Sequence, residues 1–307
     1  MMQRRLRSAG RGWRAWTLGL VLLAAGAACS RSSGGTETAG AQPAGGKRYP
    51  LHGEIVAVNL PRKTLTVAHE EIPGLMPAMT MEYAAADGDL AIAKPGQKIK
   101  ARLVEDHGAY RLEDIWPDDR VSTSTVAEAA NVLRQDTMTR ARGAYREIGE
   151  NMPDFALYDQ DGRVVSAARF RGRQIMLNFI YTRCPVATMC PAATQHMIEV
   201  QRKARAAGVT NLQLVSITFD PAHDTPGVLQ AYAQAHGIDT GNFSLLTGPE
   251  PAIRDLLTQF GVIAEFQDGL IKHTLATLLI DPQGRIIHRA DGSEWTADEF
   301  IARMHKG

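Results

Sequence analysis

The sequence has few cysteines, few aromatic residues and no concentrated positive charge. Three of its 307 residues are cysteines, and 6% are aromatic. The net charge is +1, but five arginines lie within residues 1–28, which leaves 29 basic and 33 acidic residues in the rest. A disulfide framework needs more cysteines, and nucleic-acid binding needs a basic surface with stacking platforms. The composition therefore argues against a disulfide-stapled fold and against a nucleic-acid partner.

The chain also lacks an apolar run of about 20 residues, the length that spans a bilayer comfortably. Residues 1–28 combine an arginine-rich start with an apolar stretch that ends in small residues, which is typical of a signal peptide. A retained membrane anchor is the alternative. Cys29 follows in "LLAAGAACS", where a bacterial lipoprotein signal places its lipidated cysteine. We therefore expect a lipoprotein anchored at Cys29 on the periplasmic side of a bacterial membrane, with cleavage without lipidation as the alternative.

The next two segments differ sharply in pattern. Residues 29–48 are small and polar after Cys29, as in a flexible linker. Residues 49–118 contain five short apolar or alternating runs separated by turn formers, which suits a small all-β barrel of the OB type. The expected strands are "GEIVAVNL", "TLTVAH", "MTMEYA", "QKIKARLVE" and "AYRLEDI", and "AADGD" is expected to be a turn.

Helix signals follow the strands. Residues 119–149 are expected to form a connecting helix, with Thr125 and Glu128 in the spacing of a capping box. From residue 150 to residue 307, strand and helix patterns alternate, which predicts an α/β domain. Two cysteines at the end of its strand "QIMLNFIY", just before a helix, form the thioredoxin arrangement.

The first chemical cluster is His69, Met76, Met79 and Met81. Met79 and Met81 stand two apart, so on a strand their side chains share a face. Thioether sulfur and imidazole together suit Cu(I), which is a soft cation. Packing in an irregular core is the alternative use of these methionines.

This segment resembles the periplasmic CusF-like copper-binding domain. The resemblance implies that His69, Met79 and Met81 are ligands. Met76 stands where that family has a tryptophan over the metal, so Met76 is a candidate fourth sulfur ligand. The matching stretches are "HGEIVAVN", "LTVAHE", "MPAMTM" and "KPGQKIKARL".

The second cluster is the cysteine pair. Cys184 and Cys190 flank five residues at the start of a helix, where the helix dipole favours the thiolate form that ligates metals or attacks disulfides. An inert structural disulfide is the alternative. A peroxiredoxin is disfavoured, because Tyr181 and Leu177 occupy the positions where that chemistry usually needs threonine and proline.

Residues from Met152 to Met304 resemble the Sco/SenC family of copper chaperones and thiol reductases, which have a thioredoxin-like fold. The resemblance implies that Cys184, Cys190 and His273 bind copper, as Cu(I) or alternatively Cu(II). It also leaves Asp220 and Asp224 to shape a loop near the site. The family usually has three residues between the cysteines. The matching motifs are "NFIYTRCP", "SITFDPAHDTPGVL", "KHT", "LLIDPQGRI" and "DGSEW".

Three functions follow as hypotheses. The first is a Cu(I) metallochaperone that supplies a subunit of cytochrome c oxidase or another copper protein. The second is an enzyme, a thiol–disulfide oxidoreductase that uses Cys184 and Cys190 as catalytic residues. The third is copper sequestration for resistance. The remaining histidines His196 and His223 are expected to face solvent.

Overall fold

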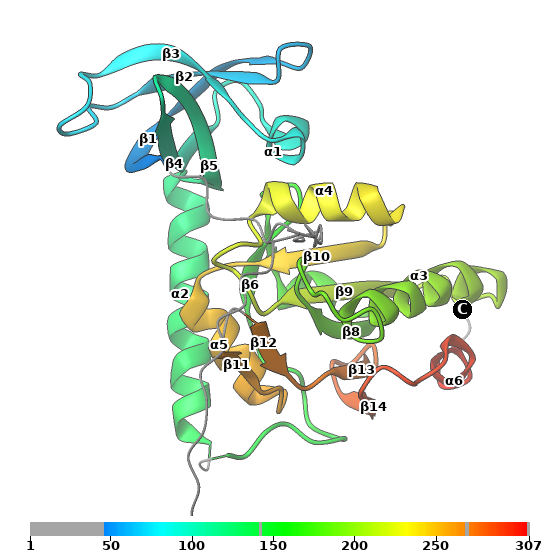
Figure 1. The fold of residues 1–307 in the computed structure, drawn as a ribbon. Coiled ribbons are helices and arrows are strands. Elements are labelled where there is room, and N and C mark those ends of the chain that lie inside the picture. The colour runs from blue at the N-terminus through cyan, green and yellow to red at the C-terminus, as the bar shows by residue number, and fades with distance from the viewer. Residues whose placement is uncertain (1–45, 141–142, 268–269, 306–307) are drawn as a thin grey trace, which may run out of the picture. The chain divides into compact units, whose positions relative to one another are not determined.

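The computed structural model describes residues 46–140, 143–267 and 270–305 (Figure 1). The signal peptide, Cys29 and most of the linker expected from the sequence lie outside these residues. Within the described ranges, no helix combines the length and the apolarity needed to cross a bilayer. The domain boundaries proposed from the sequence remain a prediction.

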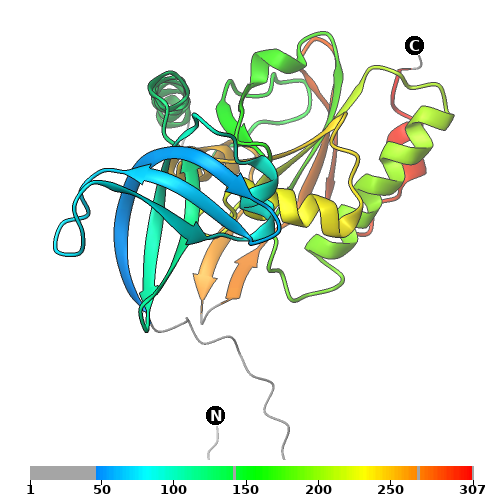
Figure 2. The same cartoon turned by 90° about the horizontal axis from the view of Figure 1, so that it is seen from above.

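The N-terminal strands close into a barrel in the order β1-β2-β3-β5-β4 (Figure 2). Neighbouring strands pair antiparallel except β3 and β5, which pair in parallel at Ala84 and Arg111. A register shift between Ile55 and Ala57 marks an irregularity in β1 of the kind that helps a sheet to curve. All five expected strands are confirmed. They are β1 (Lys47–Asn59), β2 (Thr64–His69), β3 (Met79–Ala84), β4 (Lys98–Asp106) and β5 (Ala109–Pro117).

Side-chain alternation along these strands fills the barrel. Leu65, Val67, Tyr83 and Leu103 are fully buried in its core. The expected turn at "AADGD" is wrong in part, because Asp87 begins a short helix, α1 (Asp87–Ile92). Asp-Gly-Asp is turn-like locally, but Leu90 is buried in the barrel core, and that tertiary contact favours the helical turn.

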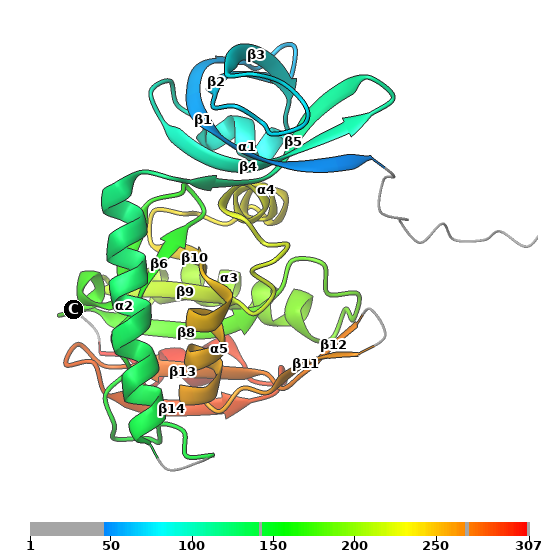
Figure 3. The same ribbon diagram turned by 90° about the vertical axis from the view of Figure 1, so that its left-hand side faces the viewer.

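Helix α2 (Arg120–Thr139) follows the barrel, and the structure corrects its expected N-terminal cap. Asp119 is the N-cap and accepts a hydrogen bond from the Ser122 backbone N–H at 2.8 Å. Thr125 donates to the Val121 carbonyl inside the helix, so it forms no capping box with Glu128. The cap lies earlier because Asp119, two residues after the end of β5, can already satisfy the first free N–H groups. Helix α2 packs beside α5 (Figure 3).

The C-terminal part is built on a seven-stranded sheet with the order β14-β13-β8-β9-β10-β6-β7. Strands β8, β9 and β10 are parallel and every residue in them is buried, as expected for strands covered on both faces. The other neighbours are antiparallel. The strands are β6 (Ala156–Asp159), β7 (Val164–Ser166), β8 (Gln174–Ile180), β9 (Leu212–Thr218), β10 (Phe243–Thr247), β13 (Ala276–Ile280) and β14 (Ile286–Asp291).

Helices connect the parallel strands in the thioredoxin-like manner, so the expected fold class is confirmed. The sequence missed β10, a five-residue strand, and the small hairpin of β11 and β12. That hairpin matters because it ends at His273. The elements are η1 (Ala167–Phe170), α3 (Cys190–Ala206), α4 (Pro226–His236), α5 (Glu250–Gln259), α6 (Ala297–Ile301), β11 (Ala264–Gln267) and β12 (Leu270–His273).

Candidate metal centres

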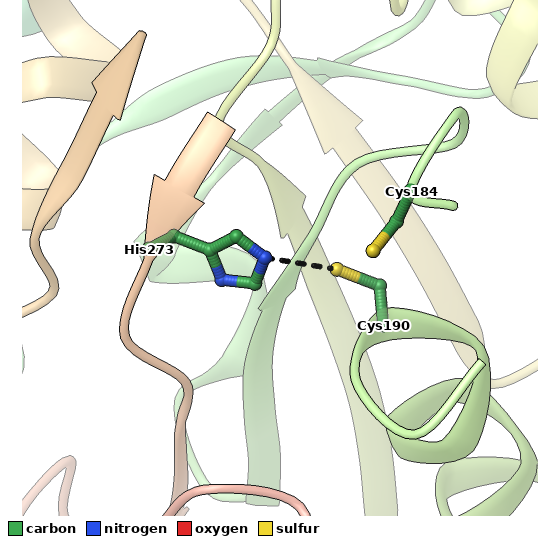
Figure 4. A group of neighbouring side chains, drawn as sticks. All are labelled: Cys184, Cys190 and His273. Carbon is green, nitrogen blue, oxygen red and sulfur yellow. Dashed lines mark hydrogen bonds between the residues drawn. The ribbon is translucent and has the colours of Figure 1, made fainter. Parts of the chain in front are cut away.

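Two thiols and one imidazole converge beyond the end of β8. Cys184 lies in the loop after β8, Cys190 is the first residue of α3, and His273 is the last residue of β12. The Cys190 Sγ lies 3.7 Å from the His273 Nε2, and the three donor atoms all lie within 4.8 Å of one another. The three side chains point toward one another, and neither cysteine is in a disulfide (Figure 4). This is the single cluster of metal-binding spacing found among the described His, Cys, Asp and Glu residues.

His273 is held in the form that binds metal. Its Nδ1 lies 3.3 Å from the Thr274 carbonyl oxygen, which can only accept, so Nδ1 carries the hydrogen and Nε2 keeps a lone pair. The ring contacts Phe219 and Tyr181, with centroid distances of 4.4 and 5.6 Å. Burial lowers the pKa of His273, which favours the neutral imidazole. A neutral imidazole with a free Nε2 is the ligand form.

The expectation that the start of α3 favours the thiolate form is wrong for Cys190. Its side chain is 1% exposed, and burial raises the pKa of the thiol far above its usual value. Desolvation outweighs the helix dipole here, because an anion moved out of water loses more than the partial charge at the helix start returns. A bound cation would replace the lost solvation and stabilise the thiolate.

Two buried carboxylates hold the loop that carries Cys184. Asp224 accepts hydrogen bonds from the Thr182 backbone N–H at 3.1 Å, from the Thr182 Oγ1 at 2.5 Å and from the Thr218 Oγ1 at 2.5 Å. Asp220 accepts from the Arg183 Nε at 2.7 Å. The expectation that Asp220 and Asp224 shape a loop near the cysteines is confirmed.

The two histidines expected to face solvent behave differently. His223 is exposed. His196 is partly buried, and its ring lies 5.1 Å from the Trp295 ring. The expectation for His196 is therefore wrong, because a tryptophan distant in the sequence covers it.

The barrel brings together the members of the first cluster. His69 ends β2 and pairs directly with Met79 on β3, while Val67 pairs with Met81. Directly opposed residues point to the same face, so His69, Met79 and Met81 share one face of the β2–β3 pair. Met79 is 44% exposed, Met81 is partly buried, and His69 is 4% exposed. The face that carries these donors therefore runs from the core toward solvent.

His69 is oriented like His273. Its Nδ1 lies 2.6 Å from the Glu70 carbonyl oxygen, so Nδ1 carries the hydrogen and Nε2 has the lone pair. That buried Nε2 has no hydrogen-bond partner among the described residues. A buried nitrogen acceptor without a partner is costly unless a ligand completes it.

Met76 and His69 both contact Tyr83. The Tyr83 hydroxyl donates to the Met76 Sδ at 3.7 Å, and the Tyr83 and His69 ring centroids are 5.9 Å apart. Burial raises the pKa of Tyr83 to about 12, so the hydroxyl remains a donor at neutral pH. The Met76 sulfur is therefore drawn toward the buried side of the cluster.

Both donor sets fit a soft cation. Thiolate, thioether and imidazole are ligands of Cu(I), whereas hard cations prefer the oxygen ligands that these clusters lack. The cysteine cluster has donor atoms close enough for bonds of about 2 Å to one ion, given small side-chain movements. The barrel cluster has an unpaired imidazole nitrogen on a strand face that also carries two thioethers.

Comparison with known proteins agrees with these two patterns. Residues 144–306, more than half of the chain, match the SCO1/SenC family. The chain belongs to the SCO1/SenC family. Residues 48–117 match the family described as "Copper binding periplasmic protein CusF", so the N-terminal barrel is CusF-like. Both resemblances inferred from the sequence motifs are confirmed.

Individual relatives match the SCO1/SenC part. The "SCO1 protein homolog" of Bacillus subtilis is 30% identical over 153 residues, which cover 48% of this chain and 78% of that protein. "Protein SCO2 homolog, mitochondrial" of Bos taurus is 32% identical over 172 residues, which cover 52% of this chain and 62% of that protein. The chain thus spans less than two thirds of the bovine relative. Among solved structures, Bradyrhizobium japonicum ScoI with copper bound is 26% identical, with a TM-score of 0.42, and the match covers 51% of this chain and 97% of that one.

The sequence reasoning did not identify Tyr83, Thr182 or Phe219 as neighbours of these SCO1/SenC and CusF-like clusters. The position of Tyr83 could have been predicted, because it stands two residues after Met81 and therefore shares its strand face. Thr182 and Phe219 had no such signal. Their roles depend on contacts between β8, β9 and β12, which are distant in the sequence.

Proposed function

We propose that this SCO1/SenC protein is a Cu(I) metallochaperone that works outside the cytoplasm. The observation that carries the proposal is the convergence of Cys184, Cys190 and a neutral His273 within 4.8 Å. Two sulfurs and one nitrogen make a low-coordinate site that holds Cu(I) and releases it by ligand exchange. Copper is cargo in this proposal. Its binding displaces the thiol proton that burial keeps on Cys190.

The barrel is proposed as a second Cu(I) site. His69, Met79 and Met81 are its ligands, and Met76 is a fourth sulfur ligand or a cover over the metal. Thioethers have no proton to lose and form no disulfides, so this site stays available in an oxidising compartment. The description of the matching family as copper-binding and periplasmic supports this assignment. Two sites on one chain can act as acceptor and donor at high effective concentration.

The recipient is proposed to be a copper centre of cytochrome c oxidase or another copper protein, as the Sco/SenC resemblance implies. The location is proposed to be the periplasmic side of a bacterial membrane, with a lipid anchor at Cys29. The periplasmic description of the CusF family supports that location.

A second candidate is disulfide reduction, which the unequal exposure of the cysteines favours. Cys184 is partly exposed and Cys190 is buried. The Cys184 thiolate would attack a substrate disulfide, and Cys190 would then resolve the mixed disulfide, leaving a Cys184–Cys190 disulfide and two substrate thiols. Chaperone and reductase use the same sulfurs, so Cu(I) affinity and reduction potential distinguish them.

Anaerobic Cu(I) titration against a competing chelator tests the chaperone proposal. We expect wild type to fill a site in each part of the chain. Cys184→Ala/Cys190→Ala is expected to retain the barrel site alone, and Met79→Ala/Met81→Ala the cysteine site alone. Each pair removes two sulfur donors from one site and leaves the other site unchanged.

Met138→Leu is the control, because Met138 lies on α2 and is 71% exposed. A wild type that binds no Cu(I) would end the chaperone proposal. Weak Cu(I) binding together with a reduction potential well below that of the compartment would favour the reductase instead. Copper sequestration would be favoured if deletion raised copper sensitivity without lowering oxidase activity.

A further inference from the structure

The loop between the two cysteines carries a third sulfur. Its five residues end at Met189, which directly precedes Cys190 and occupies the N-cap position of α3. The side chain of Met189 makes no capping hydrogen bond, and a thioether offers α3 no useful acceptor. Met189 therefore has no role in starting the helix that explains its place beside the thiols.

The main chain around Met189 is held on both sides. The Met189 N–H donates to the Val186 carbonyl at 3.0 Å, and the Ala193 N–H donates to the Met189 carbonyl at 2.9 Å. Immediately before it, the Thr188 carbonyl accepts from the Ser293 Oγ at 2.6 Å. Ser293 belongs to the segment after β14, so a distant part of the chain fixes the end of the loop. Met189 is accordingly a positioned residue on an anchored loop.

Met189 and His273 line the same pocket, which has a volume of about 490 Å³. Ser293 lies on the wall of this pocket as well. Met189 is partly buried and packs against the core of the α/β domain, and Cys190, the next residue along the chain, is 1% exposed. Of the three residues of the cysteine cluster, His273 alone lines this pocket, so the pocket reaches the cluster at His273.

The pocket is not built for an anion. Its one arginine, Arg289, donates to the Asp291 carboxylate at 2.9 Å and to the Phe260 carbonyl at 2.5 Å, and it lies over the Tyr145 ring at 5.1 Å. Its charge is therefore already compensated, and its donors are directed to protein groups. Among the residues that line the pocket, Met189 and His273 supply the donors that suit a soft cation, a thioether and an imidazole.

We propose that Met189 is the exchange ligand of the cysteine site, which receives Cu(I) from the two thiolates as it passes into this pocket. This inference rests on the proposed chaperone function. Copper remains Cu(I) throughout, no electron is transferred, and each thiolate that leaves the metal takes up a proton. A neutral thioether suits such a step, because it binds Cu(I) without holding it as strongly as a thiolate does.

The test measures the rate at which a Cu(I)-specific bidentate chelator removes copper, by anaerobic stopped-flow absorbance. The parent is the full chain with Met79→Ala/Met81→Ala, so that the cysteine site alone is loaded. Met189→Leu keeps the apolar volume, and Met189→Gln keeps the length but offers oxygen and nitrogen. We expect both to slow removal by about tenfold, the lower end of effects seen for partners of metal ligands. The equilibrium affinity of the cysteine site for Cu(I) should change much less than the rate at which the chelator removes the copper.

Met138→Leu in the same parent is the matched control and should exchange at the parental rate. A Met189→Leu rate within about twofold of the parent would overturn the proposal, because partners of metal ligands act more strongly than this. Slow exchange in Met189→Gln alone would also overturn it, since packing would then explain the effect. A parent that binds no Cu(I) would instead refute the chaperone function, so the two failures are distinguishable.

Discussion

His69 and His273 are oriented by the same kind of local hydrogen bond, although they belong to different folds. Each ends a strand, and each donates Nδ1–H to the carbonyl of the next residue, Glu70 or Thr274. The Nε2 of His273 then faces the Cys190 sulfur at 3.7 Å, and the buried Nε2 of His69 keeps its lone pair without a hydrogen-bond partner among the described residues. This contact fixes the tautomer and the ring orientation without any distant residue. A histidine that looks ordinary in the sequence thus becomes a directed donor.

Asp89 provides a prediction at the same scale. It is 7% exposed, and burial raises the pKa of its carboxyl to about 7, with the charge of Asp114 adding to the rise. The folded chain keeps the proton in a pH range where the unfolded chain has lost it, so stability falls as pH rises from about 4 to 7. We expect Asp89→Asn to remove this slope and to stabilise the chain at pH 8 by roughly 1–3 kcal/mol.

Denaturant unfolding of parent and variant at pH 5 and pH 8 measures this effect. Asp87→Asn in the same helix is the control, because its side chain is 69% exposed and pairs with Lys63 on the surface. If Asp89→Asn kept the parental dependence on pH, the buried carboxyl would not be its source.

At the scale of elements, the loop after β8 is what adapts the thioredoxin-like fold to its cysteine site. Strand β8 delivers the chain to the site, and α3 begins at Cys190. Between them, Thr182 and Arg183 are tied to Asp224 and Asp220, which follow β9. The longer spacing of the cysteines is accommodated because both ends of the loop are anchored. The fold thus tolerates five residues where its family usually has three.

Asp224→Asn is expected to loosen this loop. The substitution replaces one carboxylate oxygen, which accepts hydrogen bonds, with an amide NH2 group, which donates them. That group would face the hydroxyl donors of Thr182 and Thr218. We expect a loss of about 1–3 kcal/mol in stability, and Cu(I) affinity about 10–100-fold lower at the cysteine site. Chelator competition well below the melting temperature measures the affinity.

Asp298→Asn is the matched control, since this carboxylate is 76% exposed and pairs with Lys203. Unchanged Cu(I) affinity in a folded Asp224→Asn protein would show that the carboxylate supports the fold without positioning Cys184.

At the scale of the whole molecule, the two proposed sites rest on separate hydrophobic cores. One cluster contains the barrel residues Leu65, Val67 and Tyr83, and the other contains the sheet residues Phe179 and Phe243. Each proposed site lies at the border of its own core, so a ligand should stabilise its own core first.

Differential scanning calorimetry with Cu(I) tests this separation. Binding at 1,000 times the dissociation constant stabilises a folded unit by about 4 kcal/mol. We expect Cu(I) to raise both unfolding transitions of wild type. Only the transition of the α/β domain should rise in Met79→Ala/Met81→Ala, and only that of the barrel in Cys184→Ala/Cys190→Ala. A single transition that shifts equally in every variant would contradict separate cores.

Local patterns made much of this architecture predictable. All five barrel strands were recognisable because apolar alternation and turn residues act over a few neighbours. Two local signals were misleading. The capping box predicted at Thr125 was displaced by the earlier cap at Asp119, and the turn predicted at Asp87 was displaced by a helix that buries Leu90. Strand β10 and the β11–β12 hairpin were not recognised from the sequence.

The sequence by itself determined which donors are available: two cysteines, a strand with two methionines on one face, and the family motifs that single out His69 and His273. Only the tertiary structure decided that Cys190 meets His273 across 83 residues, and that burial keeps the Cys190 thiol protonated. Sheet order determines which distant residues meet, and desolvation depends on everything packed around a group. Neither property can be read from neighbouring residues along the chain.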